Sequence, residues 1–81
     1  MSAEFILITE IILNDYLAKI YRFNDTSTYV NSTTIDNLLP ILNDMTQSSQ
    51  IVEQLQSLIG VSKTELFDNN NELVGSSIST E

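Results

Sequence analysis

The stretch that decides the fold is residues 5–23, FILITEIILNDYLAKIYRF. It is strongly apolar within a chain whose formal net charge is -8 at pH 7, so we expect its side chains to be buried, either inside the domain or against a partner. On a helix of about 3.6 residues per turn, most of these apolar side chains share one broad face. They are Phe5, Ile6, Ile12, Leu13, Tyr16, Leu17, Ile20 and Phe23.

Three further apolar residues, Leu7, Ile8 and Ile11, fall on the opposite side of this expected helix. A helix that is apolar nearly all round is either central in a bundle or in contact with another protein. We therefore predict that Leu7, Ile8 and Ile11 bind a protein, with Tyr21 as an aromatic residue at the rim of the contact. A buried strand over residues 5–13 followed by a shorter helix is the alternative, because isoleucine favours strands and periodicity does not distinguish the two.

Two shorter helices are expected in the middle of the chain. Apolar residues recur at helical spacing over residues 36–46 and again over 49–59. Pro40 interrupts the first of these, but an N-cap at Asp36 or Asn37 would place it near the first turn, where few backbone donors have helical partners. The alternative is a helix that begins earlier and has a kink. The short polar link between the two helices predicts that they pack antiparallel as a hairpin.

The sequence after Gly60 fits two different structures. Ser62-Lys63-Thr64-Glu65 has the form of a capping box, which predicts a short helix over residues 62–68 followed by a polar tail. The alternative is a strand at 63–67, a turn, and a returning strand at 72–76.

The predicted fold is all-α. It is a small three-helix bundle, or a helical hairpin plus a long N-terminal helix, with a short fourth element near residues 62–68 and a disordered C-terminal tail. The three helices span about 4–23, 36–46 and 49–59. We divide the chain into a helical interaction domain, residues 1–68, and a flexible polar tail, residues 69–81.

The hairpin alternative has a family resemblance. A helix is followed by Gly60-Val61, the apolar pair Leu66-Phe67, a polar turn over 68–71, apolar Leu73-Val74 and then Ser76-Ser77. This order resembles the opening of a roadblock-type domain, a dynein-light-chain-like family. The resemblance implies a dimeric scaffold in a motor or small-GTPase regulatory complex. Asn71 stands where the family's turn glycine is expected, no chain is left for the family's remaining strands, and no site residues are carried over.

The amino-acid composition excludes several kinds of catalytic and metal-binding site. The chain has no cysteine and no histidine, which excludes disulfides, thiolate nucleophiles, the usual zinc sites and the usual general base. No other residues form a catalytic pattern, so we predict no enzyme, no cofactor, no metal ligands and no small-molecule substrate. Eleven acidic residues against three basic ones argue against nucleic-acid binding, because affinity for phosphates depends on Lys and Arg.

Targeting signals are also not evident. Glu10, Asp15, Lys19 and Arg22 interrupt the apolar stretch, whereas a membrane-spanning helix needs roughly 20 predominantly apolar residues. Glu4 stands where a signal peptide would carry a basic residue. We therefore expect no membrane span and an intracellular, cytoplasmic protein.

The most consistent function is that of a small acidic protein–protein interaction module. We expect it to bind itself, as a homo-oligomer, or another protein as a subunit of a larger complex, through the excess apolar surface of the N-terminal helix. Two alternatives remain: a roadblock-like scaffold subunit of a regulatory complex, and an acidic inhibitor that mimics nucleic acid.

Overall fold

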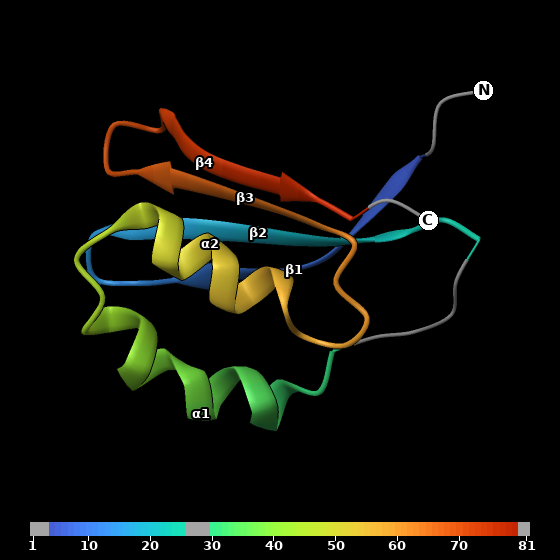
Figure 1. Ribbon diagram of the computed structural model, residues 1–81, viewed down its shortest axis with the longest axis horizontal. Helices are drawn as coiled ribbons and strands as arrows, with labels where there is room; N and C mark the ends of the chain where they lie inside the picture. The colour runs from blue at the N-terminus through green and yellow to red at the C-terminus, as the bar shows by residue number, and fades with distance from the viewer. Residues whose placement is uncertain (1–3, 26–29, 80–81) are drawn as a thin grey trace.

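The chain is built around an antiparallel β-sheet. The structure is a computed structural model that describes residues 4–25 and 30–79. Within these residues the elements are β1 (Phe5–Ile12), β2 (Tyr16–Phe23), α1 (Ser32–Asn43), α2 (Ser48–Gln56), β3 (Lys63–Asp68) and β4 (Leu73–Ile78) (Figure 1). The described strands form one four-stranded sheet in the order β1-β2-β3-β4. The fold is therefore α+β, and the predicted all-α helical bundle is wrong.

The predicted N-terminal helix is replaced by the β1–β2 hairpin. Ile11 pairs with Ala18 and Ile12 with Leu17, and the Leu13 N–H donates to the Tyr16 carbonyl at 2.9 Å to close the turn. The isoleucine-rich, aromatic composition of both arms suits a pleated surface, and Asn14-Asp15 supplies turn residues between them. The strand alternative for residues 5–13 was correct for β1, but the shorter helix expected after it is also a strand.

The β3–β4 hairpin replaces the predicted fourth helix and part of the predicted tail, and it confirms the alternative of a strand at 63–67, a turn and a returning strand at 72–76. The Asp68 carboxylate accepts from the backbone N–H groups of Asn70 and Glu72 at 2.8 and 3.0 Å. Asn71 adopts a left-handed φ of 62°, a conformation that asparagine tolerates better than most residues. The predicted disordered tail is therefore wrong over β4, and the predicted boundary at residue 68 falls inside the hairpin. Residues 1–3 of the predicted domain and 80–81 of the tail lie outside the described residues.

The two central helices were predicted, but with shifted ends. α1 begins earlier than expected because Asn31, not Asp36 or Asn37, is the N-cap, its side chain accepting from the Thr33 N–H at 2.8 Å. Pro40 therefore lies inside the helix rather than near its first turn. α2 ends at Gln56, and Gly60 has a positive φ of 96° in the connection to β3.

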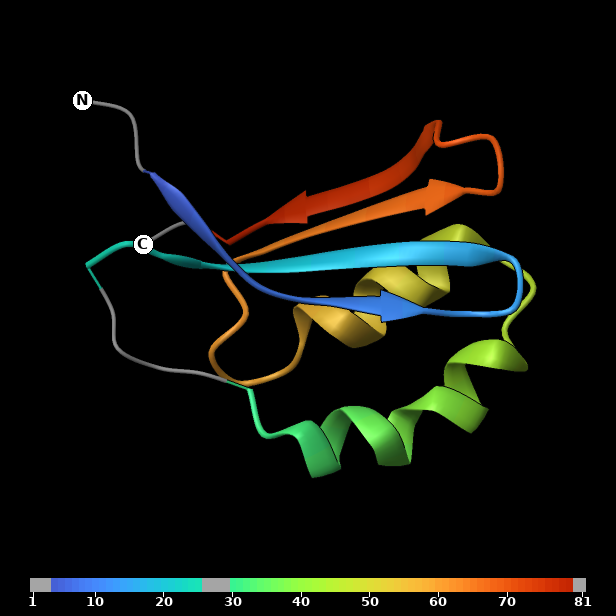
Figure 2. The same cartoon turned by 180° about the vertical axis from the view of Figure 1, so that it is seen from behind.

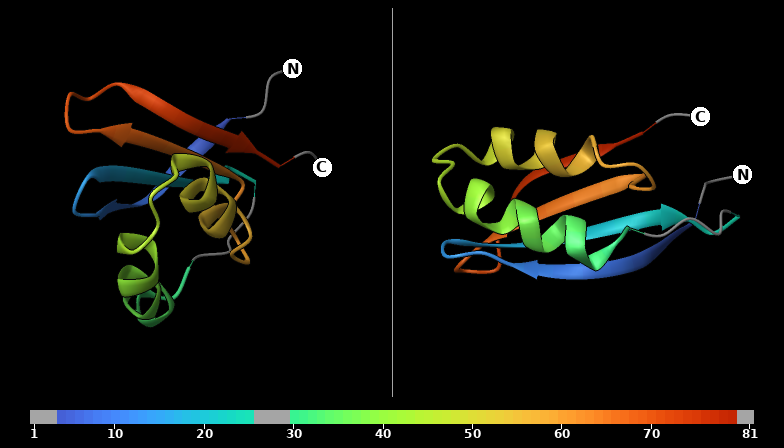
Figure 3. Two further views of the ribbon diagram at one scale, coloured as in Figure 1. Left: turned by 60° about the vertical axis from the view of Figure 1, so that its left-hand side comes forward. Right: turned by 90° about the horizontal axis from the view of Figure 1, so that it is seen from below.

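Both helices lie on the same side of the sheet (Figures 1 and 2). Figure 3 shows α2 against β3 and β4 with α1 beside it, so the helices form a layer against one side of the sheet. Alternate strand residues point into this layer, and Ala18, Ile20, Thr64 and Leu66 are fully buried there. The described apolar core is Ile11, Leu13, Ala18, Ile20, Leu42, Ile51, Val52, Leu55, Val61 and Leu66.

Candidate functional site

The other side of the sheet is covered by neither α1 nor α2, and we call it the open face (Figure 3). Because strand residues alternate, the neighbours of the fully buried residues Ala18, Ile20 and Leu66 point to this face. The pairing register aligns them in three rows that cross the sheet from β1 to β4. The apolar row is Ile12, Leu17, Phe67 and Leu73; the charged row is Glu10, Lys19, Glu65 and Ser76; the mixed row is Leu7, Tyr21, Lys63 and Ile78.

The edges of the open face are the most exposed. In the apolar row, Ile12 on β1 is 80% exposed and Leu73 on β4 is 54% exposed. In the mixed row the corresponding edge residues, Leu7 and Ile78, are 44% and 54% exposed. Large apolar side chains thus stand at all four corners of the face. Soluble monomers rarely expose several large apolar side chains on one face, and such a face is typical of a contact surface.

The middle of the face is held by polar and aromatic contacts. The Tyr21 hydroxyl donates to Glu65 Oε1 at 2.6 Å, and Lys63 Nζ lies 3.5 Å from Glu65 Oε2. Lys63 Nζ also lies 5.2 Å from the centre of the Phe5 ring, and Lys19 Nζ lies 5.2 Å from that of Phe67. In these cation–π contacts the lysine side chains keep their positive charge, and their aliphatic stems cover apolar surface.

The charges of this network affect the pKa of Tyr21. Partial burial, the hydrogen bond to Glu65 and the negative charges of Glu65 and Glu10 together raise the pKa of Tyr21 to about 12. All of these causes disfavour a second anion beside the carboxylate. The phenol therefore stays protonated and keeps donating at any physiological pH.

The open face differs from the rest of the surface in its charge. The rows contain both lysines of the chain, Lys19 and Lys63, and only two of its eleven acidic residues, Glu10 and Glu65. Their charges cancel. The formal charge of -8 therefore belongs entirely to the remainder of the chain. A neutral, apolar face on an acidic protein favours association through that face and disfavours it elsewhere.

The predicted protein-binding residues are divided between the two sides of the sheet. Leu7 and Tyr21 are paired neighbours on the open face. Ile8 is an extra residue where the β1–β2 register shifts, and it packs partly buried against the core. Ile11 is 3% exposed and belongs to the core under the helices, so it is not accessible to a partner.

Sequence reasoning missed the larger part of the face. Leu17, Phe67, Leu73 and Ile78 come from three strands, one of them in the predicted tail. A signal was present in KTELFD at 63–68, where Lys63, Glu65 and Phe67 alternate with buried Thr64 and Leu66. That alternation indicates a strand with two different faces.

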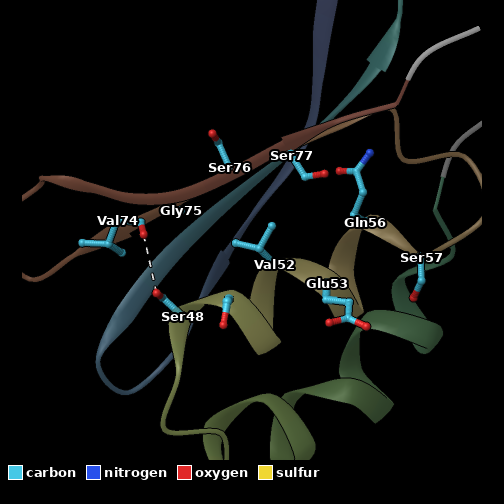
Figure 4. Close-up of a pocket in the computed structure, with 10 residues that line it drawn as sticks. Ser48, Val52, Glu53, Gln56, Ser57, Val74, Gly75, Ser76 and Ser77 are labelled. Carbon is cyan, nitrogen blue, oxygen red and sulfur yellow. Dashed lines mark hydrogen bonds between the residues drawn. The ribbon is translucent and has the colours of Figure 1, made fainter.

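Apart from the open face, a groove lies between α2 and β4. This groove has a volume of about 530 Å³, and five serines are among the ten residues that line it, with Glu53 as the one charged residue (Figure 4). Gly75 lets α2 approach closely, because a Cβ there would lie 2.9 Å from Val52 Cγ2. The Gln56 amide is fully engaged, donating to the Ser62 carbonyl and Ser79 Oγ and accepting from Thr64 Oγ1. The groove therefore offers neither a nucleophile with a base nor a cluster of ligands.

Other kinds of site are not found in the part of the chain that the structure describes. No group of three or more Asp, Glu, His or Cys side chains there is placed to hold a metal ion. No helix among the described residues has the length and apolarity to cross a membrane.

Comparison with known proteins found no family model, no curated protein and no solved structure that matches this chain. The roadblock-like and nucleic-acid-mimic hypotheses therefore stay predictions. The residues of the open face remain the basis for a functional argument.

Proposed function

We propose that this chain is a protein-binding module whose contact surface is the open face of the sheet. The proposal keeps the interaction function expected from the sequence but moves it from an N-terminal helix to the strands. The observation that carries it is the combination of exposed apolar corners with a net charge of zero, on a chain of net charge -8.

The chemistry of the face defines the partner. Burial of the apolar and mixed rows would supply the driving force, at about 25 cal/mol per Å² of apolar area removed from water. The charged row would fix the register, because a partner that left Lys19 or Glu65 buried without an opposite charge would be disfavoured. The expected partner is therefore a flat, largely apolar protein surface with opposite charges at its centre. A strongly basic ligand would gain little electrostatic attraction, because the charges of the open face cancel.

Site-specific photocrosslinking tests this function without knowledge of the partner. Leu73 is replaced by photoreactive benzoylphenylalanine in cells that naturally produce the chain. The matched control carries the same group at Ile59, which is apolar and 92% exposed but lies outside the open face. We expect discrete protein adducts from position 73 and none from position 59. No adducts from position 73, or the same adducts from both positions, would reject the open face as a protein-binding surface.

A further inference from the structure

We infer that the partner of the open face is a second copy of this chain, packed face to face about a two-fold axis parallel to the strands. This inference rests on the proposed function of the open face. The choice of axis follows from the positions of the opposite charges in the charged row, with Lys19 on β2 and Glu65 on β3.

Such an axis, placed between β2 and β3, reverses the strand order of the second sheet but keeps each row at the same height. β2 then lies over β3 of the partner subunit, and β1 over β4 of the partner subunit. In the charged row, Lys19 meets Glu65 of the partner subunit, and Glu65 meets Lys19 of the partner subunit. A two-fold interface needs self-complementarity of this kind, because each contact occurs twice.

The other two rows match under the same operation. In the apolar row, Ile12 meets Leu73 of the partner subunit and Leu17 meets Phe67 of the partner subunit. In the mixed row, Tyr21 meets Lys63 of the partner subunit, which places a cation over an aromatic ring, as Lys63 already does within one chain at 5.3 Å. Each row therefore finds a partner of suitable chemistry.

The competing face-to-face arrangement has its two-fold axis along the rows. Each strand would then lie over its own copy, so that Lys19 faces Lys19 of the partner subunit and Glu65 faces Glu65 of the partner subunit. Like charges at the centre of a desolvated contact are strongly unfavourable. The charge order thus selects the axis parallel to the strands.

The dimensions fit a reversible dimer. Strands about 4.8 Å apart and about 3.3 Å per residue give four strands of six residues a face of roughly 400 Å² in projection. Two such faces bury on the order of 1,000 Å² of accessible surface, at the low end for specific interfaces. The sheets would stack about 10 Å apart, as in an aligned β-sandwich. Glu53 belongs to α2, which packs against the opposite side of β3 and β4, and then lies on the outer side.

Charge exchange provides the decisive experiment. The 81-residue chain and two variants, Lys19→Glu and Glu65→Lys, are studied by sedimentation equilibrium at about physiological ionic strength, where surface charges beyond roughly 8 Å are screened. We expect the unmodified chain to dimerise in the micromolar range. Each variant alone places like charges across the axis and should dimerise at least tenfold more weakly. An equimolar mixture should recover the dimer, because the heterodimer restores an opposite charge at both crossings. Circular dichroism checks that both variants are folded.

A second measurement does not depend on the charge variants. Purified chain with benzoylphenylalanine at Leu73 is irradiated, and the crosslinked peptides are identified by mass spectrometry. The proposed axis predicts attachment to β1 near Ile12 of the partner subunit. Attachment to β4 of the partner subunit, or a mixture of variants that associates no better than each alone, would overturn the arrangement. A monomeric chain at several hundred micromolar would overturn self-association, whereas adducts to a different protein in cells would leave the proposed function standing.

Discussion

Tyr21 and Glu65 lie 44 positions apart in the sequence and are joined by a 2.6 Å hydrogen bond from the Tyr21 hydroxyl to the Glu65 carboxylate. The bond crosses from β2 to β3 on the open face, and it links the mixed row, which contains Tyr21, to the charged row, which contains Glu65. Burial of the phenol, the hydrogen bond to the carboxylate and the carboxylate charge all disfavour a phenolate, so folding favours the protonated phenol. The stability that results is fully present below the ordinary tyrosine pKa of about 10 and is lost as the pH rises from there through about 12, the pKa of Tyr21 in the folded chain.

We predict that Glu65→Gln lowers the pKa of Tyr21 from about 12 towards 10, because it removes both the charge and the anionic acceptor. Ultraviolet titration of tyrosinate measures this pKa, with the spectrum of a Tyr21→Phe chain subtracted to remove the other tyrosines. Asp36→Asn on α1 is the matched control and should leave the pKa unchanged. An unchanged value after Glu65→Gln would show that the carboxylate does not control this phenol.

At the scale of single elements, α2 is the best-anchored helix. Its Gln56 side chain makes three hydrogen bonds, of 2.7 to 3.1 Å, to Thr64 in β3, to Ser62 just before β3 and to Ser79 just after β4. One of these bonds satisfies the hydroxyl of Thr64, which is fully buried. The contact therefore joins α2 to the two C-terminal strands and supplies polar partners that water cannot reach.

We predict that Gln56→Ala destabilises the fold by about 1–3 kcal/mol, because it leaves the Thr64 hydroxyl buried without a partner. Adding Thr64→Val to that variant should recover part of the loss, since the stranded hydroxyl is then absent. Urea unfolding measures both changes. Gln54→Ala is the control, because Gln54 is an exposed glutamine on the same helix. Equal losses in the two alanine variants would mean that helix propensity, rather than the hydrogen bonds, is responsible.

The helices were predicted directly from the sequence, whereas β1 and the β3–β4 hairpin appeared only as alternatives and β2 was not predicted. Apolar residues at helical spacing located 36–46 and 49–59, close to the observed Ser32–Asn43 and Ser48–Gln56. A helix was favoured over β1 and β2 because both faces of these strands carry apolar residues, Ile11 and Ala18 inside, Leu7 and Leu17 outside. A strand of this kind has no polar–apolar alternation, and its apolar residues fit a helical face equally well.

At the scale of the whole molecule, the excess apolarity of residues 5–23 has a double explanation. One half of it forms the core under α1 and α2, and the other half forms part of the open face. The sequence indicated that this excess must be covered and named Leu7 and Tyr21 as contact residues on a helix, but it did not predict that they are paired across β1 and β2. Their juxtaposition with Lys63 and Ile78 depends on the β2–β3 pairing, which joins distant parts of the chain.

That central pairing also has a consequence for the speed of folding. Each hairpin forms between neighbouring segments, but β2 and β3 meet only after the whole segment from residue 24 to residue 62 has closed as a loop. Closing this loop costs chain entropy before the contacts between the strands repay it. We therefore expect the step that joins the two hairpins to limit the folding rate.

Lengthening the connection between α1 and α2 tests this expectation. Inserting about eight glycine and serine residues after Met45 should slow refolding and leave the unfolding rate nearly unchanged, because the added entropy is lost before the transition state. Stopped-flow tyrosine fluorescence measures both rates. The same insert appended after Glu81 lies outside the loop and should change neither. Faster unfolding with unchanged refolding would instead show that the hairpins join only after the barrier has been crossed.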